Sequence, residues 1–333
     1  MGEVASVFEA HVCRSYGDYR DLTIEELPLV GPARGEVLVR NQAFAVGFPD
    51  LLTIQGKYQR KPSLPFVPGS EFCGEVVAVG EGVEKTRIGD VVIGTVLLGS
   101  FAKMVVAAAE NCMVLPESYD FVTGAAFHNA YRTAYVALVE RAHLQPGETL
   151  LVHGAAGGVG LAAIQLGKVL GARVIATASS AEKLKWASSN GADHTLDAST
   201  PSFRDSVKGL TSGVGADVIF DPVGGDVFDE SLHCIAPFGR ILVIGFTSGR
   251  IPDVATNYPL LKQMSIVGVR AGEFGRLDPG GGRRVAKALL DLATRGKLRP
   301  HIHKRLSFTQ VERAFDEILG RTVVGRIVVL TGQ

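Results

Sequence analysis

A run of small residues between positions 150 and 160 has the residue types and spacing of a phosphate-binding turn. The segment reads LLVHGAAGGVG, and Ala155, Gly157 and Gly160 follow an apolar run and open a helical pattern. Small residues let the backbone approach a pyrophosphate closely, and the free amides of a helix N-terminus bind its oxygens. The sequence therefore predicts a dinucleotide site, and the alternative is a tight structural turn in an α/β sheet. The residues expected to contact the dinucleotide here are Ala156, Gly157, Gly158 and Val159.

The end of the next predicted strand bears on which dinucleotide is bound. An NAD site usually places an Asp or Glu about 20 residues after the glycine turn, where it binds the ribose 2′-OH. Here the strand runs into ATASSAEK, which offers Ser179, Ser180 and Lys183 and no acid at the strand end. Two hydroxyls and an ammonium group can bind a 2′-phosphate that a carboxylate would repel, so the segment favours NADP(H). The same residues can also simply begin a helix, with Ser179 or Ser180 as N-cap and Lys183 in solvent.

The elements that must position these residues alternate between strand and helix. We expect strands at 149–153, 172–177, 216–220, 239–245 and 264–269, and helices at 158–170, 180–190 and 226–235. This alternation is typical of a parallel sheet covered on both faces. The first 120 residues instead resemble short strands interrupted by glycine, and the last strand, in GRIVVLTG, is expected to rejoin them. The glycine-rich segment 272–284 is predicted to be an exposed connection.

Composition excludes several classes of function. The 333 residues include 34 Lys and Arg against 34 Asp and Glu, so no basic field suggests nucleic acid or an anionic membrane as partner. There is no stretch of about 18 uncharged apolar residues, and the N-terminus MGEVASVFEAHVC lacks the apolar core of a secretory signal. The 4 cysteines are far apart, which is typical of reduced thiols. We expect a cytoplasmic protein of two domains that binds neither nucleic acid nor membrane.

Several motifs together resemble the medium-chain dehydrogenases/reductases, and more narrowly their zinc-independent quinone oxidoreductase (zeta-crystallin-like) family. The motifs are LPFVPGSEFCGEVVAVGEGV, HGAAGGVG, DPVGGDVF, GRILVIGFTSG and GRIVVL, and the resemblance covers essentially the whole chain. It implies an α/β fold class, in which a GroES-like β domain is joined to a Rossmann domain with a doubly wound parallel sheet and the active site lies in the cleft. We place the GroES-like substrate domain at 1–124, completed by 272–333, and the Rossmann NADPH-binding domain at 125–271.

The places of the catalytic zinc ligands in the zinc-dependent relatives hold other residues here. They align with Gly47, Ser70 and Asn129, whereas catalytic zinc needs about three thiolate, imidazole or carboxylate donors. We therefore expect no metal. Because nothing would then stabilise a developing alkoxide, the resemblance implies NADPH-dependent hydride transfer to an electrophilic acceptor, either a quinone or another conjugated carbonyl.

The resemblance also implies roles for single residues. Asp50 and Tyr58 match positions that line the family's substrate cleft, where Tyr58 would donate a hydrogen bond or proton to the substrate and Asp50 would orient a neighbour. Their alternatives are a rim tyrosine and an acid packed beneath the cleft. Leu52 and Ile54 stand where relatives carry Tyr and Arg, which favours a larger apolar substrate. Further cofactor contacts are implied at Thr133, Gly245, Phe246, Thr247 and Arg326.

Two other functions compete with quinone reduction. An enoyl-thioester or 2-alkenal double-bond reductase would use the same cofactor site, and only turnover distinguishes it. A non-catalytic crystallin-like or RNA-binding role is disfavoured by the retained phosphate turn and the zero net charge. The resemblance further implies a homodimer formed through sheet edges, and the apolar strand within 261–269 is the expected edge.

Overall fold

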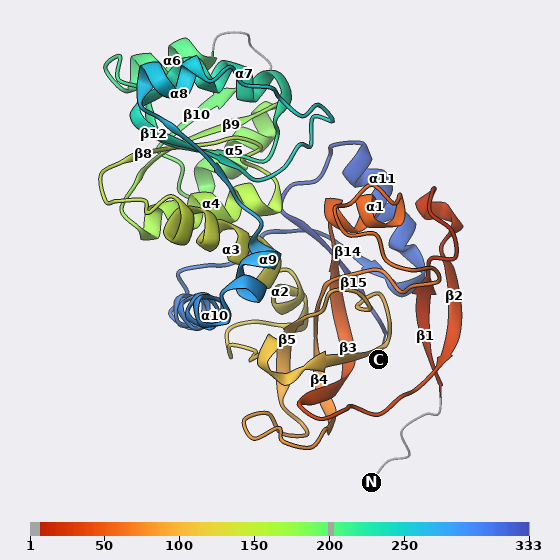
Figure 1. The fold of residues 1–333 in the computed structure, drawn as a ribbon. Helices are drawn as coiled ribbons and strands as arrows, with labels where there is room; N and C mark the ends of the chain where they lie inside the picture. Colours follow the sequence, from red (N-terminus) through yellow and green to blue (C-terminus); the bar gives the residue numbers. More distant parts are fainter. Residues whose placement is uncertain (1–6, 199–202, 333) are drawn as a thin grey trace. The chain divides into compact units, whose positions relative to one another are not determined.

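The computed structural model describes residues 7–198 and 203–332, which form two compact units (Figure 1). One unit contains the chain up to residue 129 and from residue 300 onward, and the other contains residues 130–299. Residues 1–6 of the N-terminal segment, which was expected not to be a secretory signal, lie outside the described residues. No helix among the described residues is long and apolar enough to cross a membrane.

The unit of residues 130–299 is built on a six-stranded sheet in the order β10-β9-β8-β11-β12-β13, with every neighbouring pair parallel. The strand order reverses direction between β8 and β11, so the predicted doubly wound parallel sheet is confirmed. The strands are β8 (Thr149–Val152), β9 (Arg173–Ala178), β10 (His194–Asp197), β11 (Ala216–Asp221), β12 (Ile235–Val243) and β13 (Ser265–Gly268).

Helices cover both faces of this sheet, which explains why its central strands are apolar throughout. All four residues of β8, TLLV, are buried, as expected for a strand with helices on both sides. Figure 1 shows α4 on one side of the strands and α6, α7 and α8 gathered on the other. The helices are α4 (Gly158–Val169), α5 (Ala181–Ser189), α6 (Phe203–Leu210), α7 (Gly225–Cys234), α8 (Asn257–Lys262), α9 (Ala271–Leu277) and α10 (Pro279–Thr294).

Some elements of this unit differ from the sequence prediction. Strand β10 and helix α6 were not predicted, and β12 begins four residues earlier than expected. The glycine-rich segment expected to be an exposed connection forms α9 and the start of α10 instead. Asp278 caps α10 by accepting a hydrogen bond from the Gly281 amide (2.8 Å). A β-carbon on Gly282 would lie 2.9 Å from the Gly275 Cα, so these glycines allow the two helices to pack closely.

The boundaries between the units also differ from the expected positions. Residues 272–299, expected to complete the β domain, group with the parallel-sheet unit. Arg284 of α10 forms an ion pair with Glu140 (3.8 Å). Gln165 on α4 also holds Arg299 through both backbone groups, since its Oε1 accepts from the Arg299 amide (2.9 Å) and its Nε2 donates to the Arg299 carbonyl (2.9 Å). Such contacts between residues distant in sequence decide where the segment belongs.

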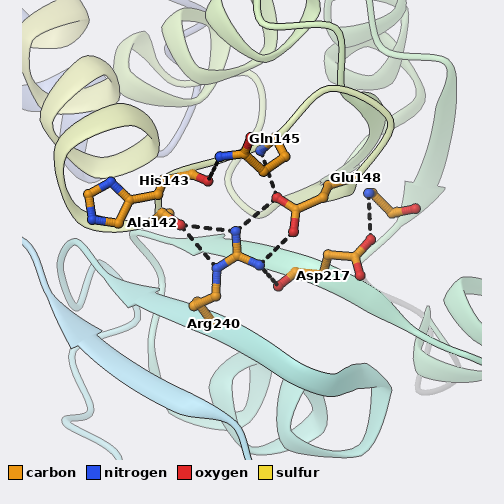
Figure 2. A network of polar contacts seen from close by, with 7 residues as sticks. Ala142, His143, Gln145, Glu148, Asp217 and Arg240 are labelled. Carbon is orange, nitrogen blue, oxygen red and sulfur yellow. Dashed lines mark hydrogen bonds and ion pairs between the residues drawn. The ribbon is translucent and has the colours of Figure 1, made fainter.

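Arg240 forms hydrogen bonds near the amino ends of the parallel strands (Figure 2). The Arg240 guanidinium donates to both carboxylate oxygens of Glu148 (2.7 and 2.8 Å) and to the Ala142 carbonyl. Asp217 in the same cluster accepts from the Thr149 amide (2.8 Å). Burial raises the pKa of Glu148, but the bonds from Arg240 and the Gln145 amide outweigh burial and hold that pKa below its ordinary value. This network lies away from the carboxyl ends where ligands bind, and we assign it to stability.

The other unit contains a mixed sheet in the order β14-β15-β3-β4-β5-β7, with β6 also paired to β3, and a two-stranded sheet of β1 and β2. The final strand, β15, pairs antiparallel with β3, so the prediction that the chain's end rejoins the N-terminal region is confirmed. The strands are β1 (Val7–Val12), β2 (Thr23–Pro28), β3 (Glu36–Val46), β4 (Glu71–Val79), β5 (Val91–Thr95), β6 (Met104–Ala108), β7 (Cys112–Val114), β14 (Ile302–Ser307) and β15 (Arg326–Leu330).

Short helices close the core of this unit. The core is formed by rings and branched chains such as Phe44, Phe72, Phe101 and Phe315, all of which are completely buried. The helices are α1 (Phe48–Ile54), α2 (Phe121–Ala125) and α11 (Val311–Leu319). Helix α3 (His128–Tyr135) spans the division between the units and continues into a π-helical segment, Val136–Arg141.

Candidate functional site

The turn between β8 and α4 has the geometry that close approach to a phosphate requires. Gly154 adopts a positive φ of 56°, which favours glycine. The Gly157 amide donates to the Gly154 carbonyl (3.0 Å) and closes the turn. A β-carbon on Gly160 would lie 2.4 Å from the Gly154 oxygen and 2.8 Å from the Ala155 Cα, so only glycine fits there. Gly154 and Gly160 thus each have a separate conformational or steric reason, whereas a β-carbon on Gly157 would make only an ordinary contact, 3.4 Å from the Gly154 oxygen.

The N-terminus of α4 provides amides suited to an anion. The first intrahelical bond runs from the Leu161 amide to the Gly157 carbonyl (2.9 Å), so the amides of Gly158, Val159 and Gly160 precede the regular helical bonding pattern. The N-cap, Gly157, has no side chain to satisfy them. Together with the helix dipole, these amides suit the pyrophosphate of a dinucleotide.

The residues predicted for the 2′-phosphate lie together at the end of β9. Ser179 is exposed, and Ser180 and Lys183 are half-buried. Ser180 is the N-cap of α5, since its hydroxyl accepts from the Lys183 amide (3.3 Å). The capping role is thus present, and it uses the Ser180 oxygen as acceptor, which leaves the hydroxyl hydrogen to donate to a phosphate oxygen. Ala178 ends the strand where an NAD site would usually place an acid.

Two further strand-end loops are bonded to each other at the same edge of the sheet. The Asp221 carboxylate accepts from the amides of Val223 (2.8 Å) and Gly224 (3.0 Å), and so shapes the loop after β11. Burial raises the pKa of Asp221, and these two bonds oppose that rise. In the loop after β12, the Thr247 amide and hydroxyl both donate to the Pro222 carbonyl (3.1 Å each).

This pairing places the predicted residues Gly245, Phe246 and Thr247 against the loop that follows β11. A β-carbon on Gly224 would lie 2.9 Å from Cδ1 of Phe246, and Gly224 has a positive φ of 68°. Thr133 lies half-buried on α3. The carboxyl ends of strands flanking a reversal in strand order are the usual ligand-binding edge of such sheets, so most of the predicted cofactor residues gather where the fold predicts.

The two predicted substrate residues, Asp50 and Tyr58, belong to the mixed-sheet unit and differ in how far they are buried. Asp50 is only 8% exposed. Its Oδ2 accepts from the Gly47 amide (2.8 Å) at the start of α1. Burial raises the pKa of Asp50 to about 6, against the opposing effects of the Gly47 amide and the Arg326 charge. Tyr58 is half-buried after α1, where its amide donates to the Leu52 carbonyl (3.1 Å).

One residue used to infer the substrate is not available to any ligand. Ile54 is completely buried in the core of the mixed-sheet unit, so its apolar character reflects packing against that core. Leu52 is half-buried. The inference that both positions make the site less polar is therefore wrong for Ile54, and only Leu52 remains accessible to favour a larger apolar substrate.

Arg326 was predicted to contact the cofactor, and in the structure its guanidinium forms an ion pair with Glu71. The other Glu71 oxygen accepts from the Asn129 amide (3.0 Å), and Asn129 Nδ2 donates to Ser70 Oγ (3.0 Å). The Arg326 side chain is 14% exposed. Burial lowers its pKa, against the raising effect of Asp50. Arg326 is thus shared between two carboxylates of its own unit.

These contacts show why the cluster does not fit a zinc ion. A β-carbon on Gly47 would lie 3.3 Å from Nη1 of Arg326, so the first of the three positions aligned with zinc ligands lies against a guanidinium. The Asn129 backbone amide, at the third position, bonds to Glu71, the ion-pair partner of that guanidinium. Gly47 offers no donor atom, and Ser70 and Asn129 are bonded to each other. A second cation beside the guanidinium would be repelled. Among residues 7–198 and 203–332, no group of three or more His, Cys, Asp or Glu is placed to hold a metal.

Comparison with known proteins identifies the class to which the chain belongs. Residues 33–117 match the family model described as the alcohol dehydrogenase GroES-like domain, and residues 158–292 match the one described as zinc-binding dehydrogenase. The quinone oxidoreductase-like protein 2 homolog of Nematostella vectensis is 39% identical, over 98% of this chain and 90% of the relative. A quinone oxidoreductase of Pseudomonas aeruginosa is 36% identical, over 95% and 97%.

Solved structures agree with the sequence relatives. A mycobacterial protein, solved in complex with NADPH, superposes with a TM-score of 0.90 at 31% identity, covering 97% of this chain and 100% of that one. The CurK enoyl reductase gives a TM-score of 0.88 at 28% identity, covering 97% and 98%. The fold and the paired domain matches define a medium-chain dehydrogenase/reductase architecture. Within that superfamily, this chain belongs to the quinone oxidoreductase family.

Sequence reasoning missed several polar residues around the two sites. Glu71 was quoted within a motif but was given no role, and the segment from Asp221 to Gly224 was expected only to end a strand near the nicotinamide or to form a plain β-turn. The Glu71 signal was present, since this carboxylate follows the Ser70 that replaces a zinc ligand. His153 lies inside the phosphate motif itself and also received no role, although it is completely buried and hydrogen-bonded on both ring nitrogens.

Proposed function

We propose that this protein is an NADP(H)-dependent oxidoreductase that transfers a hydride, without a metal, to quinones or other conjugated carbonyls. The observation that carries the proposal is the phosphate turn, where Gly160 lies so close to the Gly154 carbonyl that a side chain is excluded. The quinone oxidoreductase relatives and the NADPH complex of a mycobacterial neighbour support the same activity.

The parallel-sheet unit would bind the cofactor through its strand-end loops. The amides of Gly158 and Val159 would hold the pyrophosphate, and Ser179, Ser180 and Lys183 would hold the 2′-phosphate. The bound nucleotide supplies the hydride. The remaining cofactor contacts that we propose are Ala156, Gly157, Thr133, Gly245, Phe246, Thr247 and Arg326.

The mixed-sheet unit would act on the acceptor. Tyr58 is proposed to donate a hydrogen bond or a proton to the substrate oxygen. Asp50 is proposed to orient its neighbours, because its carboxylate is fixed by the Gly47 amide and faces the charge of Arg326. In place of a Lewis acid, this cluster presents a guanidinium, two hydrogen-bonded neutral side chains and the two buried carboxyl groups of Asp50 and Glu71. Such a cluster suits an acceptor that is already electrophilic.

A second candidate is reduction of an enoyl thioester or alkenal, which the CurK enoyl reductase neighbour favours. Its chemistry differs from quinone reduction in the final step, since an enolate must be protonated at carbon. The two activities are separated by following NADPH oxidation with benzoquinone, phenanthrenequinone and crotonyl-CoA in parallel. Quinone-dependent turnover supports the first proposal, whereas turnover with crotonyl-CoA alone transfers the assignment to the second.

We further propose that the protein forms a homodimer through the edge of the parallel sheet. Strand β13 is the outermost strand beside β12. Helix α8, which precedes it, carries Leu260 and Leu261 with 75% and 77% of their surface exposed. Exposed apolar side chains next to an open strand edge require a covering partner, and a second copy of the chain provides an identical edge.

A further inference from the structure

The His153 imidazole is placed at the centre of the parallel sheet's carboxyl edge. It directly follows β8, and its amide donates to the Phe220 carbonyl of β11 (3.0 Å). The order of strands reverses between β8 and β11, which is where open α/β sheets bind nucleotides. The side chain is completely buried, with the ring of Phe203 edge-on at 5.2 Å. His153 thus lies in the interior at this reversal.

Each ring nitrogen bonds to a buried hydroxyl, one on a strand of the sheet and the other on a helix that covers it. Nδ1 lies 2.8 Å from Thr177 Oγ1 on β9, and Nε2 lies 2.8 Å from Ser231 Oγ on α7. The Ser231 hydroxyl donates its hydrogen to the Val227 carbonyl (2.7 Å), so its oxygen accepts from Nε2–H. Nδ1 is then the acceptor for the Thr177 hydroxyl, which assigns the tautomer from the network.

The ring is neutral in this arrangement near pH 7. Burial lowers the pKa of His153 to about 3, so the imidazole is neutral with one donor and one acceptor. A neutral, fully paired group of this kind fixes the positions of its partners. Its side chain is completely buried, so we assign it a structural role.

The two partners control different ends of the proposed cofactor site. On one side, the Thr177 carbonyl accepts from the Ala155 amide of the phosphate turn (3.0 Å), and Ser179 and Ser180 follow it in the chain. On the other side, Ser231 belongs to α7, which begins directly after the loop shaped by Asp221. His153 therefore links the loops after β8, β9 and β11.

We propose that His153 is a positioning residue that sets the distance between the 2′-phosphate end and the nicotinamide end of the NADP(H) site. The inference rests on the proposed cofactor, and it assigns separate effects to the two hydroxyls. Loss of the Thr177 hydroxyl disturbs the 2′-phosphate end, and loss of the Ser231 oxygen disturbs the nicotinamide end.

Two near-isosteric variants, Thr177→Val and Ser231→Ala, test this assignment by binding alone, without any electron acceptor. The ligands are NADPH and 2′,5′-ADP, which contains the 2′-phosphate half and lacks nicotinamide. We expect Thr177→Val to weaken both ligands by about tenfold, because one buried partner is removed at the end that they share. Ser231→Ala should weaken NADPH by about tenfold and leave 2′,5′-ADP unchanged.

Thr149→Val is the matched control, because Thr149 is a buried threonine at the amino end of the neighbouring strand β8. It should bind both ligands as the wild type does. Circular dichroism and thermal unfolding establish that each variant is folded. The role of His153 is overturned if Ser231→Ala weakens 2′,5′-ADP binding as much as Thr177→Val does. It is also overturned if both variants fold and neither weakens binding. Failure of the wild type to bind NADPH overturns the proposed function instead.

Discussion

At the scale of single residues, Asp50 is a buried carboxyl group, and its burial disfavours the ionised form. Its carboxylate receives the Gly47 amide and faces Arg326. These contacts do not offset the loss of water, since the net effect raises its pKa to about 6. A raised pKa in the folded state means that the fold favours the protonated carboxyl.

This gives a prediction for the pH dependence of stability. Because the folded protein binds the Asp50 proton more tightly than the unfolded chain does, proton binding adds to the free energy of unfolding. This stabilisation is complete below the unfolded pKa near 4 and is lost as the pH rises through about 6. The free energy of unfolding of the wild type, relative to Asp50→Asn, should therefore fall by up to about 3 kcal/mol across this window. Urea unfolding of both proteins between those pH values measures it, and a difference that rises with pH contradicts the assignment.

Lys183 offers a second residue-scale prediction, concerning the choice of nucleotide. We expect Lys183→Ala to raise the KM for NADPH by about tenfold and to leave the KM for NADH unchanged, because only NADPH has the 2′-phosphate that an ammonium group binds. Lys185→Ala, two residues further along α5 at an exposed position, is the control and should alter neither. Equal effects on both nucleotides would place the 2′-phosphate elsewhere.

At the scale of elements, the turn between β8 and α4 shows how closely a sequence motif can correspond to structure. The glycines at positions 154 and 160 follow from the conformational and steric limits on the turn, and these limits match the residue types and spacing of the motif. The same applies to the sheet, since apolar runs alternating with helical periodicity specify parallel strands. The connection between the Gln165 side chain and the Arg299 backbone joins residues 134 apart in the sequence, and no local pattern indicates it.

The turn leads to a prediction about α4. Gly160→Ala would place a methyl group 2.4 Å from the Gly154 carbonyl oxygen, so the turn must open and the amides of the helix N-terminus must move. We expect NADPH affinity to fall by at least about a hundredfold, since several charge-assisted hydrogen bonds are lost together. Isothermal titration calorimetry of the folded variant measures this.

Gly209→Ala provides the matched control for that experiment. Gly209 lies within α6, and a β-carbon there meets no atom within 4 Å. The substitution should leave NADPH binding unchanged and stabilise the protein by about 0.5–1 kcal/mol, because alanine loses less backbone entropy in a helix than glycine does. Unchanged NADPH binding by Gly160→Ala would contradict the phosphate role of the turn.

At the scale of the whole molecule, the sequence indicated the two units. It did not indicate some long-range contacts, nor to which unit one segment belongs. The change from short strands to alternating strands and helices indicated both units, and the final strand returned to the first sheet as expected. Residues 272–299 were misplaced, because glycines read as loop residues serve the close packing of α9 and α10. The pair of Glu71 and Arg326 joins residues 255 apart, so only the folded chain reveals that Arg326 is already bonded.

The proposed dimer yields a prediction at this scale. Leu261→Glu would place a charge beside the open edge of β13, and in a two-fold dimer the charge enters the interface twice. We expect the dissociation constant of the dimer to rise by about a hundredfold or more. Light scattering after size-exclusion chromatography measures it, with Leu319→Glu, an exposed leucine on α11, as control. A wild type that is monomeric at high concentration contradicts the proposal.

The most direct test of the central claim is the ratio of kcat/KM for NADPH to that for NADH, measured with benzoquinone in the presence of EDTA. We expect quinone-dependent turnover that EDTA does not reduce and a ratio of at least about ten, which one charged contact to the 2′-phosphate would give. A ratio near or below one, or loss of activity with EDTA, would contradict it.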